Sequence, residues 1–151
     1  MSKTVVKTTP FLLIAAPDAT MTLRTLQSYL EPLLNLHPHG QVLLLGLPGL
    51  PNTHWPRSLR LTAPVQARAA ARLLHYLLRS GKLNPTREVP VFWVGFGNGS
   101  MSLISLLTGA LVEDPELAPL KNATRLVTFL NGFSWVDPVG QVKMFRFYFE
   151  C

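Results

Sequence analysis

The sequence predicts a protein of the α/β class: a three-layer α/β/α sandwich around a mostly parallel sheet of about four or five strands. Short, continuous apolar runs alternate with amphipathic helical segments, and the connections between them are mostly short. Runs that are apolar at every position are typical of parallel strands buried on both faces. The 151 residues fit a single domain, whose core we expect to span about residues 10–149.

Five strands and three helices are expected along the chain. The expected strands are 11–16, 41–45, 89–94, 125–130 and 142–149, and the helices begin after Thr20 or Thr22, after Thr62 and at Ser100. Pro32 should kink or end the first helix, and Gly81 should end the second, which Thr62 caps. The third helix is expected to reach about Val112, before an acidic loop at 113–116.

The composition favours a folded domain that is partly covered by more protein. Apolar residues make up 48% of the chain and charged residues only 15%, so a core forms easily while the surface carries little charge. We therefore expect a protein partner, or the remainder of a longer chain. The net charge of +6 suits an acidic partner or a polyanion. No lysine-rich run or basic motif interleaved with aromatic residues appears, so nucleic-acid binding is only weakly indicated.

Half of the basic residues lie between Arg57 and Arg87, and some of them share one face of a predicted helix. Arg68, Arg72, His75 and Arg79 are spaced by four, three and four residues, which places them on one helical stripe. A solvated helix face is the favoured interpretation, and an interaction surface is the alternative. His54 and Trp55, in the loop after the second strand, are further candidates for that surface.

Cysteine and histidine usage gives no sign of disulfides or metals. The single cysteine, Cys151, can form no internal disulfide, which favours a reducing, cytoplasmic location. The run at 11–16 is interpreted as a strand rather than a signal peptide, because it is short and follows a proline. No apolar stretch approaches the ~18 residues of a membrane span. His37 and His39 have no third ligand nearby, so no metal is predicted, and no cofactor is expected.

The most informative segment is Val94 to Ser100, which reads V-G-F-G-N-G-S. It follows a buried strand and opens a helix, the setting of the nucleophile elbow G-x-S-x-G. The flanking glycines Gly95 and Gly99 are present, as so tight a turn requires. Gly97, however, holds the central position, and glycine offers no oxygen or sulfur to attack a carbonyl.

At this segment the chain resembles the α/β-hydrolase superfamily. The elbow is similar to the family's V-G-H-S-M-G-G, with Phe96 at the histidine, Gly97 at the serine and Ser100 at the last glycine. The loop 46–49 is similar to the family's D-x-P-G, with glycine in place of the aspartate. The resemblance covers about residues 10–135, roughly half of a usual family domain, and so implies a truncated fold.

The resemblance also exposes two departures besides the missing nucleophile. In the family, the loop after the first of these strands often donates a backbone N–H to the oxyanion. Here that loop contains Pro17, which has no N–H, and Asp18, which would repel a developing negative charge if it pointed inward. The family's acid would fall near Asp137, although a turn residue before a proline is the simpler interpretation. The family's histidine comes late, whereas all four histidines here precede the elbow.

These observations predict a pseudoenzyme: a non-catalytic α/β-hydrolase-like module for protein interaction or assembly within a larger protein. The alternative is a small-molecule binding protein that uses the vacated pocket above Gly97. The residues that would line the vacant site are Gly95, Gly97, Asn98, Gly99, Ser100, Asp18 and Asp137.

Two enzymatic or cofactor-binding interpretations remain behind these. A serine hydrolase could use Ser100 or Ser102, but both fall in the first turn of the predicted helix, where capping of free N–H groups is favoured. A nucleotide-binding glycine loop is disfavoured, because the motif does not follow the first strand and no acidic strand-end residue lies about 20 positions on.

Overall fold

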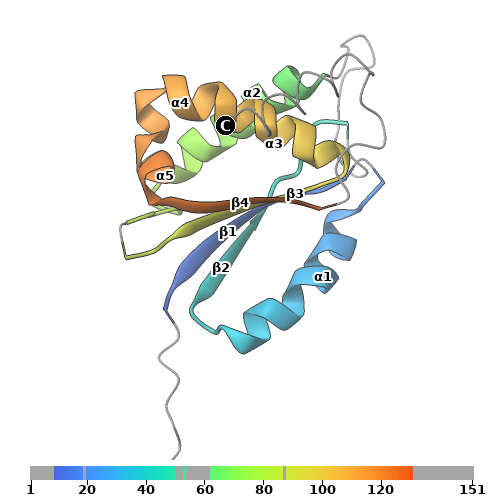
Figure 1. Cartoon of the computed structure of the whole chain (residues 1–151), viewed down its shortest axis with the longest axis vertical. Helices are drawn as coiled ribbons and strands as arrows, with labels where there is room; N and C mark the ends of the chain where they lie inside the picture. Colours follow the sequence, from blue (N-terminus) through green and yellow to red (C-terminus); the bar gives the residue numbers. More distant parts are fainter. Residues whose placement is uncertain (1–8, 19, 50–52, 54–61, 87, 131–151) are drawn as a thin grey trace, which may run out of the picture.

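The chain forms a four-stranded parallel sheet with helices on both faces (Figure 1). The computed structural model describes residues 9–18, 20–49, 53, 62–86 and 88–130. In spatial order the strands are β2 (Gly40–Leu44), β1 (Phe11–Ala16), β3 (Val91–Phe96) and β4 (Thr124–Leu130). All three pairings are parallel, so the predicted α/β sandwich with a parallel sheet is confirmed.

The helices divide between the two faces of the sheet. Helix α1 (Leu23–Leu36) lies on one face, and the other face carries the remaining helices (Figure 1). These are α2 (Ala63–Arg79), α3 (Asn98–Thr108), α4 (Ala110–Glu113), the 3-10 turn η1 (Pro115–Leu117) and α5 (Ala118–Ala123). Within β1, Leu12 and Ile14 enter the core under α2 and α3, whereas Leu13 enters the core under α1. This alternation explains why the strand is apolar at every position.

Helix α1 begins where the sequence predicts but is not ended by its proline. The Thr22 hydroxyl accepts a hydrogen bond from the Thr25 N–H at 3.0 Å, which satisfies one free donor of the first turn. Pro32 lies inside the helix, which continues to its end at Leu36. Leu30 and Leu33, on either side of the proline, both pack against the sheet, and this burial outweighs one lost backbone hydrogen bond.

The third strand and third helix differ from their predicted bounds. Strand β3 starts and ends two residues later than expected, because Gly95 and Phe96 are still paired with β4, opposite Phe129 and Leu130. Helix α3 therefore begins directly after the elbow, at Asn98 rather than Ser100, and it ends at Thr108. Residues 110–113 form a separate helix, because the backbone of Gly109, with a φ of −107° and a ψ of −99°, interrupts the helical conformation.

The other predicted elements show smaller differences. Strand β2 begins and ends one residue earlier than expected. Thr62 stands at the N-cap of α2, but its hydroxyl makes no capping hydrogen bond. Gly81 follows the end of this helix with a φ of 71°, as a glycine stop requires. The expected acidic loop contains η1 and leads into α5. The strand expected at 142–149 lies outside the described residues.

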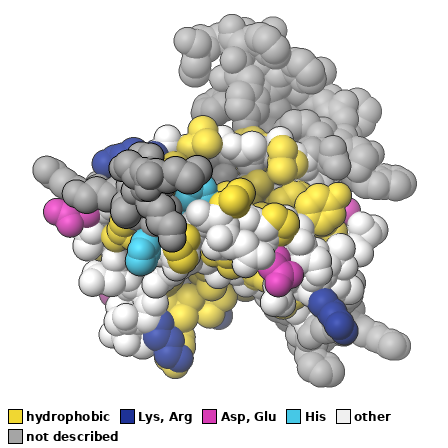
Figure 2. All heavy atoms as spheres, turned by 90° about the horizontal axis from the view of Figure 1, so that it is seen from below, with side chains coloured by type: hydrophobic (Ala, Val, Ile, Leu, Met, Phe, Trp, Pro, Cys, Tyr) yellow, Lys and Arg dark blue, Asp and Glu magenta, His cyan; other side chains and the backbone are white. Residues whose placement is uncertain are grey.

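Beyond α1, the same face of the sheet carries exposed apolar side chains. Leu126 and Leu130 of β4 pair in register with Phe92 and Phe96, whose side chains belong to the core under α1. Leu126 is 56% exposed and Leu130 is 43% exposed. Figure 2 views the molecule from this side and shows hydrophobic side chains near the middle of the face, with charged ones mostly toward its edge. In the part of the chain that the structure describes, no helix has the length and apolar character of a membrane span.

Candidate functional site

The candidate site lies at the carboxyl ends of β1 and β3, where the strand order reverses. From β1 the chain passes to β2 on one side, then crosses back to β3 on the other side of β1. Such a switch point separates the loops that leave neighbouring strands and is the usual ligand position in open parallel sheets. Ala16 and Gly95 are register partners, so the loops that follow them meet, and Asp18 comes to lie against Gly97.

Gly97 has the backbone conformation of a sharp strand-to-helix turn. Its φ is 49° and its ψ is −122°, a combination that strains residues with a Cβ. The turn is held by two backbone hydrogen bonds of 3.0 Å: Gly97 N–H donates to the Leu130 carbonyl, and Ser100 N–H donates to the Gly97 carbonyl. The elbow geometry is thus present, and glycine adopts it without strain.

The flanking glycines are required by close backbone contacts. A Cβ on Gly95 would stand 2.7 Å from the Cα of Ser100. A Cβ on Gly99 would stand 2.3 Å from the Pro17 carbonyl oxygen and 2.4 Å from that of Ala16. Helix α3 therefore starts in contact with both β3 and the loop after β1, and the residues at both positions must lack a side chain.

The carboxylate of Asp18 occupies the space directly above Gly97. Its Oδ1 accepts a hydrogen bond from the Asn98 N–H at 2.8 Å, and its Oδ2 accepts one from the Thr20 hydroxyl at 2.7 Å. A Cβ at residue 97 would lie 2.4 Å from Oδ1 and 2.5 Å from Cγ of this aspartate. The negative charge also faces the N-terminus of α3, where the helix dipole favours an anion. Asp18 thus points inward and fills the position from which a side chain at residue 97 would project.

Ser100 and Ser102 of this helix are both buried, but neither of them caps it. Ser100 is fully buried, and its hydroxyl has no hydrogen-bond partner among the described residues. Ser102 is 3% exposed, and its hydroxyl donates to Gln66 Oε1. Gln66 Nε2 in turn donates to the Pro48 carbonyl at 2.7 Å, which ties the loop after β2 to α2 and α3. The expectation that these serines cap the helix is wrong, because the helix starts two residues earlier than predicted and the N-cap is Gly97.

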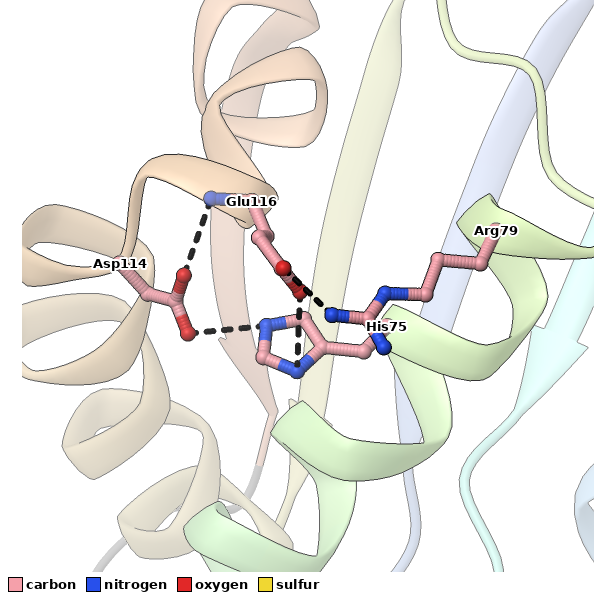
Figure 3. A network of polar contacts seen from close by, with 4 residues as sticks. All are labelled: His75, Arg79, Asp114 and Glu116. Carbon is pink, nitrogen blue, oxygen red and sulfur yellow. Dashed lines mark hydrogen bonds and ion pairs between the residues drawn. The ribbon is translucent and has the colours of Figure 1, made fainter.

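The two C-terminal residues of the basic stripe on α2, His75 and Arg79, are in contact with carboxylates of the same chain (Figure 3). His75 Nε2 lies 2.9 Å from Asp114 Oδ2, and His75 Nδ1 lies 3.9 Å from Glu116 Oε2. The Arg79 guanidinium forms an ion pair and a hydrogen bond with Glu116. These contacts hold the end of α2 against η1, so Arg79 has a structural partner although it was a candidate for the interaction surface.

The remaining candidates divide between exposed and undescribed residues. Arg68 and Arg72 are exposed on the outer face of α2. His54, Trp55 and Asp137 lie outside the described residues. Among the residues that the structure places, no group of three or more histidine, cysteine, aspartate or glutamate side chains is arranged to hold a metal ion.

Two of the surface hollows are lined by described residues alone, and neither of these two includes the elbow. One, of about 580 Å³, lies at the amino-terminal ends of β1 and β2 and includes Pro10 and His39. The other, of about 380 Å³, lies beside β2 and α2 and includes Leu43 and Leu77. The space over Gly97 holds the Asp18 carboxylate, so binding of a small molecule there stays a prediction.

The comparisons with known proteins identify the fold. The sequence matches no protein-family profile and no curated protein. The structure is similar to an iodinated complex of acetyl xylan esterase, with a TM-score of 0.51 and 11% sequence identity, over 82% of this chain and 63% of the esterase. Esterase PE8 aligns over 93% of this chain and 92% of its own, with 15% identity and a TM-score of 0.44. The likeness shows that this chain has an α/β fold similar to that of acetyl xylan esterase, and this chain spans less than two thirds of that enzyme.

Proposed function

We propose that this chain is a non-catalytic α/β-hydrolase-like module that serves in protein interaction or assembly. The observation that carries the proposal is the carboxylate of Asp18, which lies over Gly97 and accepts the Asn98 N–H at 2.8 Å. The esterase-like fold explains why the turn has the elbow geometry, but fold alone does not give activity.

The Asp18 contact opposes acyl-transfer chemistry in two ways. A hydrolase of this type needs a nucleophilic side chain on residue 97, and here a carboxylate fills the space into which such a side chain would extend. It also needs backbone donors for the oxyanion, and the N–H of the residue after the nucleophile is one of them. At that residue, Asn98, the N–H already binds an anion. Loss of one such donor costs about 10²- to 10³-fold in rate.

The first test is an activity and labelling experiment. Hydrolysis of a short-chain nitrophenyl ester and labelling by a fluorophosphonate probe are measured on the wild type, on Gly97→Ser and on Gly97→Ser combined with Asp18→Ala. We expect no turnover and no labelling of the wild type or of Gly97→Ser, because all four histidines precede the elbow in the sequence and Asp18 crowds the new hydroxyl. Labelling of the wild type at Ser100 or Ser102 would contradict the proposal and make this chain an enzyme.

The interaction half of the proposal is supported by the apolar face beyond α1. Leu126 and Leu130 are about half exposed, whereas their register partners Phe92 and Phe96 are partly or fully buried in the core under α1. Exposed apolar side chains that lie together on one face favour an association surface. Sedimentation velocity and thermal melting of the chain, with and without Leu126→Lys, test this. We expect concentration-dependent association that the lysine weakens. A highly stable, monodisperse monomer at all concentrations would argue against it.

A further inference from the structure

The outer face of α2 combines exposed cations with exposed apolar side chains. Arg68 and Arg72 are exposed on successive turns, and Tyr76, one turn further on, is 57% exposed. Leu73, which is 37% exposed, neighbours Tyr76 on the helix surface. The ammonium group of Lys82 lies 5.4 Å from the centre of the Tyr76 ring, close enough for a cation–π contact. We call these five residues the α2 surface.

The positive charge of the α2 surface is not neutralised from within the described chain. Helix α2 contains no aspartate or glutamate. Nearby carboxylates, those of Asp114 and Glu116, are in contact with His75 and Arg79 instead (Figure 3). Among the described residues no carboxylate forms an ion pair with the three cations of the α2 surface, and the whole chain carries a net charge of +6.

We propose that the α2 surface docks an acidic amphipathic helix of a partner protein. Arg68 and Arg72 are about 6 Å apart along the helix, the spacing at which carboxylates four residues apart stand on a facing helix. Arginine binds carboxylates with two parallel hydrogen bonds, and arginine and tyrosine are the residue types that dominate binding energy at protein interfaces.

The aliphatic side chain of Leu73 favours a protein partner over a nucleic acid. Leu73 and the Tyr76 ring can pack against leucine-like side chains of an amphipathic helix. A phosphate backbone carries no aliphatic side chains that could pack against Leu73. The proposal gives the interaction role a surface and a partner chemistry. It rests on that role but not on the absence of catalysis, so the labelling experiment and the binding experiment fail independently.

The test uses a fluorescent peptide helix with glutamate at every fourth position and leucine on the adjacent stripe, titrated with the protein at low salt. Fluorescence anisotropy reports binding to the wild type and to the double variant Arg68→Glu/Arg72→Glu. The matched control is Arg24→Glu/Lys121→Glu, which changes the net charge equally at exposed positions on α1 and α5. We expect the α2 variant to weaken binding about tenfold or more and the control to change it less than about twofold.

A third variant and a competitor separate the alternatives. Leu73→Ser should weaken peptide binding about threefold and leave binding of a single-stranded oligonucleotide unchanged. Circular dichroism confirms that each variant is folded. The proposal is overturned if the peptide shows no saturable binding to the wild type, if the control loses as much affinity as the α2 variant, or if the oligonucleotide binds more tightly than the peptide.

Discussion

Replacing Gly97 with alanine should destabilise the fold strongly, and the cost should depend on Asp18. At a φ of 49° and a ψ of −122°, a residue with a Cβ is strained by about 1–3 kcal/mol. The new Cβ would also lie 2.4 Å, 2.5 Å and 3.0 Å from Oδ1, Cγ and Cβ of Asp18. Overpacking of this kind costs a further 1–3 kcal/mol, roughly. Gly97→Ala alone should therefore lower the free energy of unfolding by about 4 kcal/mol.

A double-mutant cycle isolates the steric part of this cost. Asp18→Ala removes the two closest atoms and leaves only the Cβ contact of 3.0 Å, which a small shift relieves. In that background Gly97→Ala should cost only about 2 kcal/mol, so the two changes should be less than additive by about 2 kcal/mol. Urea denaturation of the four proteins, followed by circular dichroism, measures each free energy of unfolding.

Gly81 provides the matched control for this cycle. Its φ is 71°, but no atom lies within 4 Å of the position of an added Cβ, so Gly81→Ala introduces backbone strain without crowding. It should cost about 1–2 kcal/mol and add independently to Asp18→Ala. Additive effects of Gly97→Ala and Asp18→Ala would refute the reasoning, because they would mean that the carboxylate does not fill the space above the elbow.

Two further predictions concern the contacts around α3. Gly99→Ala should lower the free energy of unfolding at least as much as Gly97→Ala, because its Cβ would meet backbone carbonyls that cannot rotate away. The loss should be the same in the Asp18→Ala background. The same urea denaturations measure this, and a smaller loss in that background would contradict it. Gln66→Ala should destabilise the fold by about 1–2 kcal/mol more than Ser102→Ala. The reason is that Gln66 forms hydrogen bonds with both the Pro48 carbonyl and the Ser102 hydroxyl, whereas Ser102 forms only one. Equal losses of stability in thermal melts would show that the link to the loop after β2 contributes nothing.

The layers of the fold could be read from the sequence because burial dictates them. A strand covered on both faces must be apolar throughout. The apolar run 11–16 lies between Pro10 and Pro17, so the predicted bounds match those of β1. The bounds of β3 and α3 depend on pairing with β4, a contact between distant segments that no local pattern encodes. Pro32 was interpreted from its local effect on the backbone, whereas packing of the leucines on either side decides that the helix continues.

The elbow could be recognised from its local sequence, but the Asp18 carboxylate in the space above it could not. The spacing of Gly95, Gly97 and Gly99 is a local constraint on one tight turn, and it is visible in the sequence. The hydrogen bond between Asn98 and Asp18 joins residues 80 positions apart and follows from the register of β1 against β3. Likewise, the ion pair of Arg79 with Glu116 depends on how η1 packs against α2. Helical periodicity predicts a stripe of cations but does not show that Arg79 is paired within the chain.

The glycine at residue 97 and the aspartate at residue 18 are best understood as one arrangement. Without a side chain on Gly97, the Asn98 N–H at the start of α3 has an open space in front of it, and the Asp18 carboxylate enters that space and bonds to it. A serine at 97 would compete with the Asp18 carboxylate for this volume. This interdependence is the structural reason for proposing an interaction module rather than a dormant hydrolase.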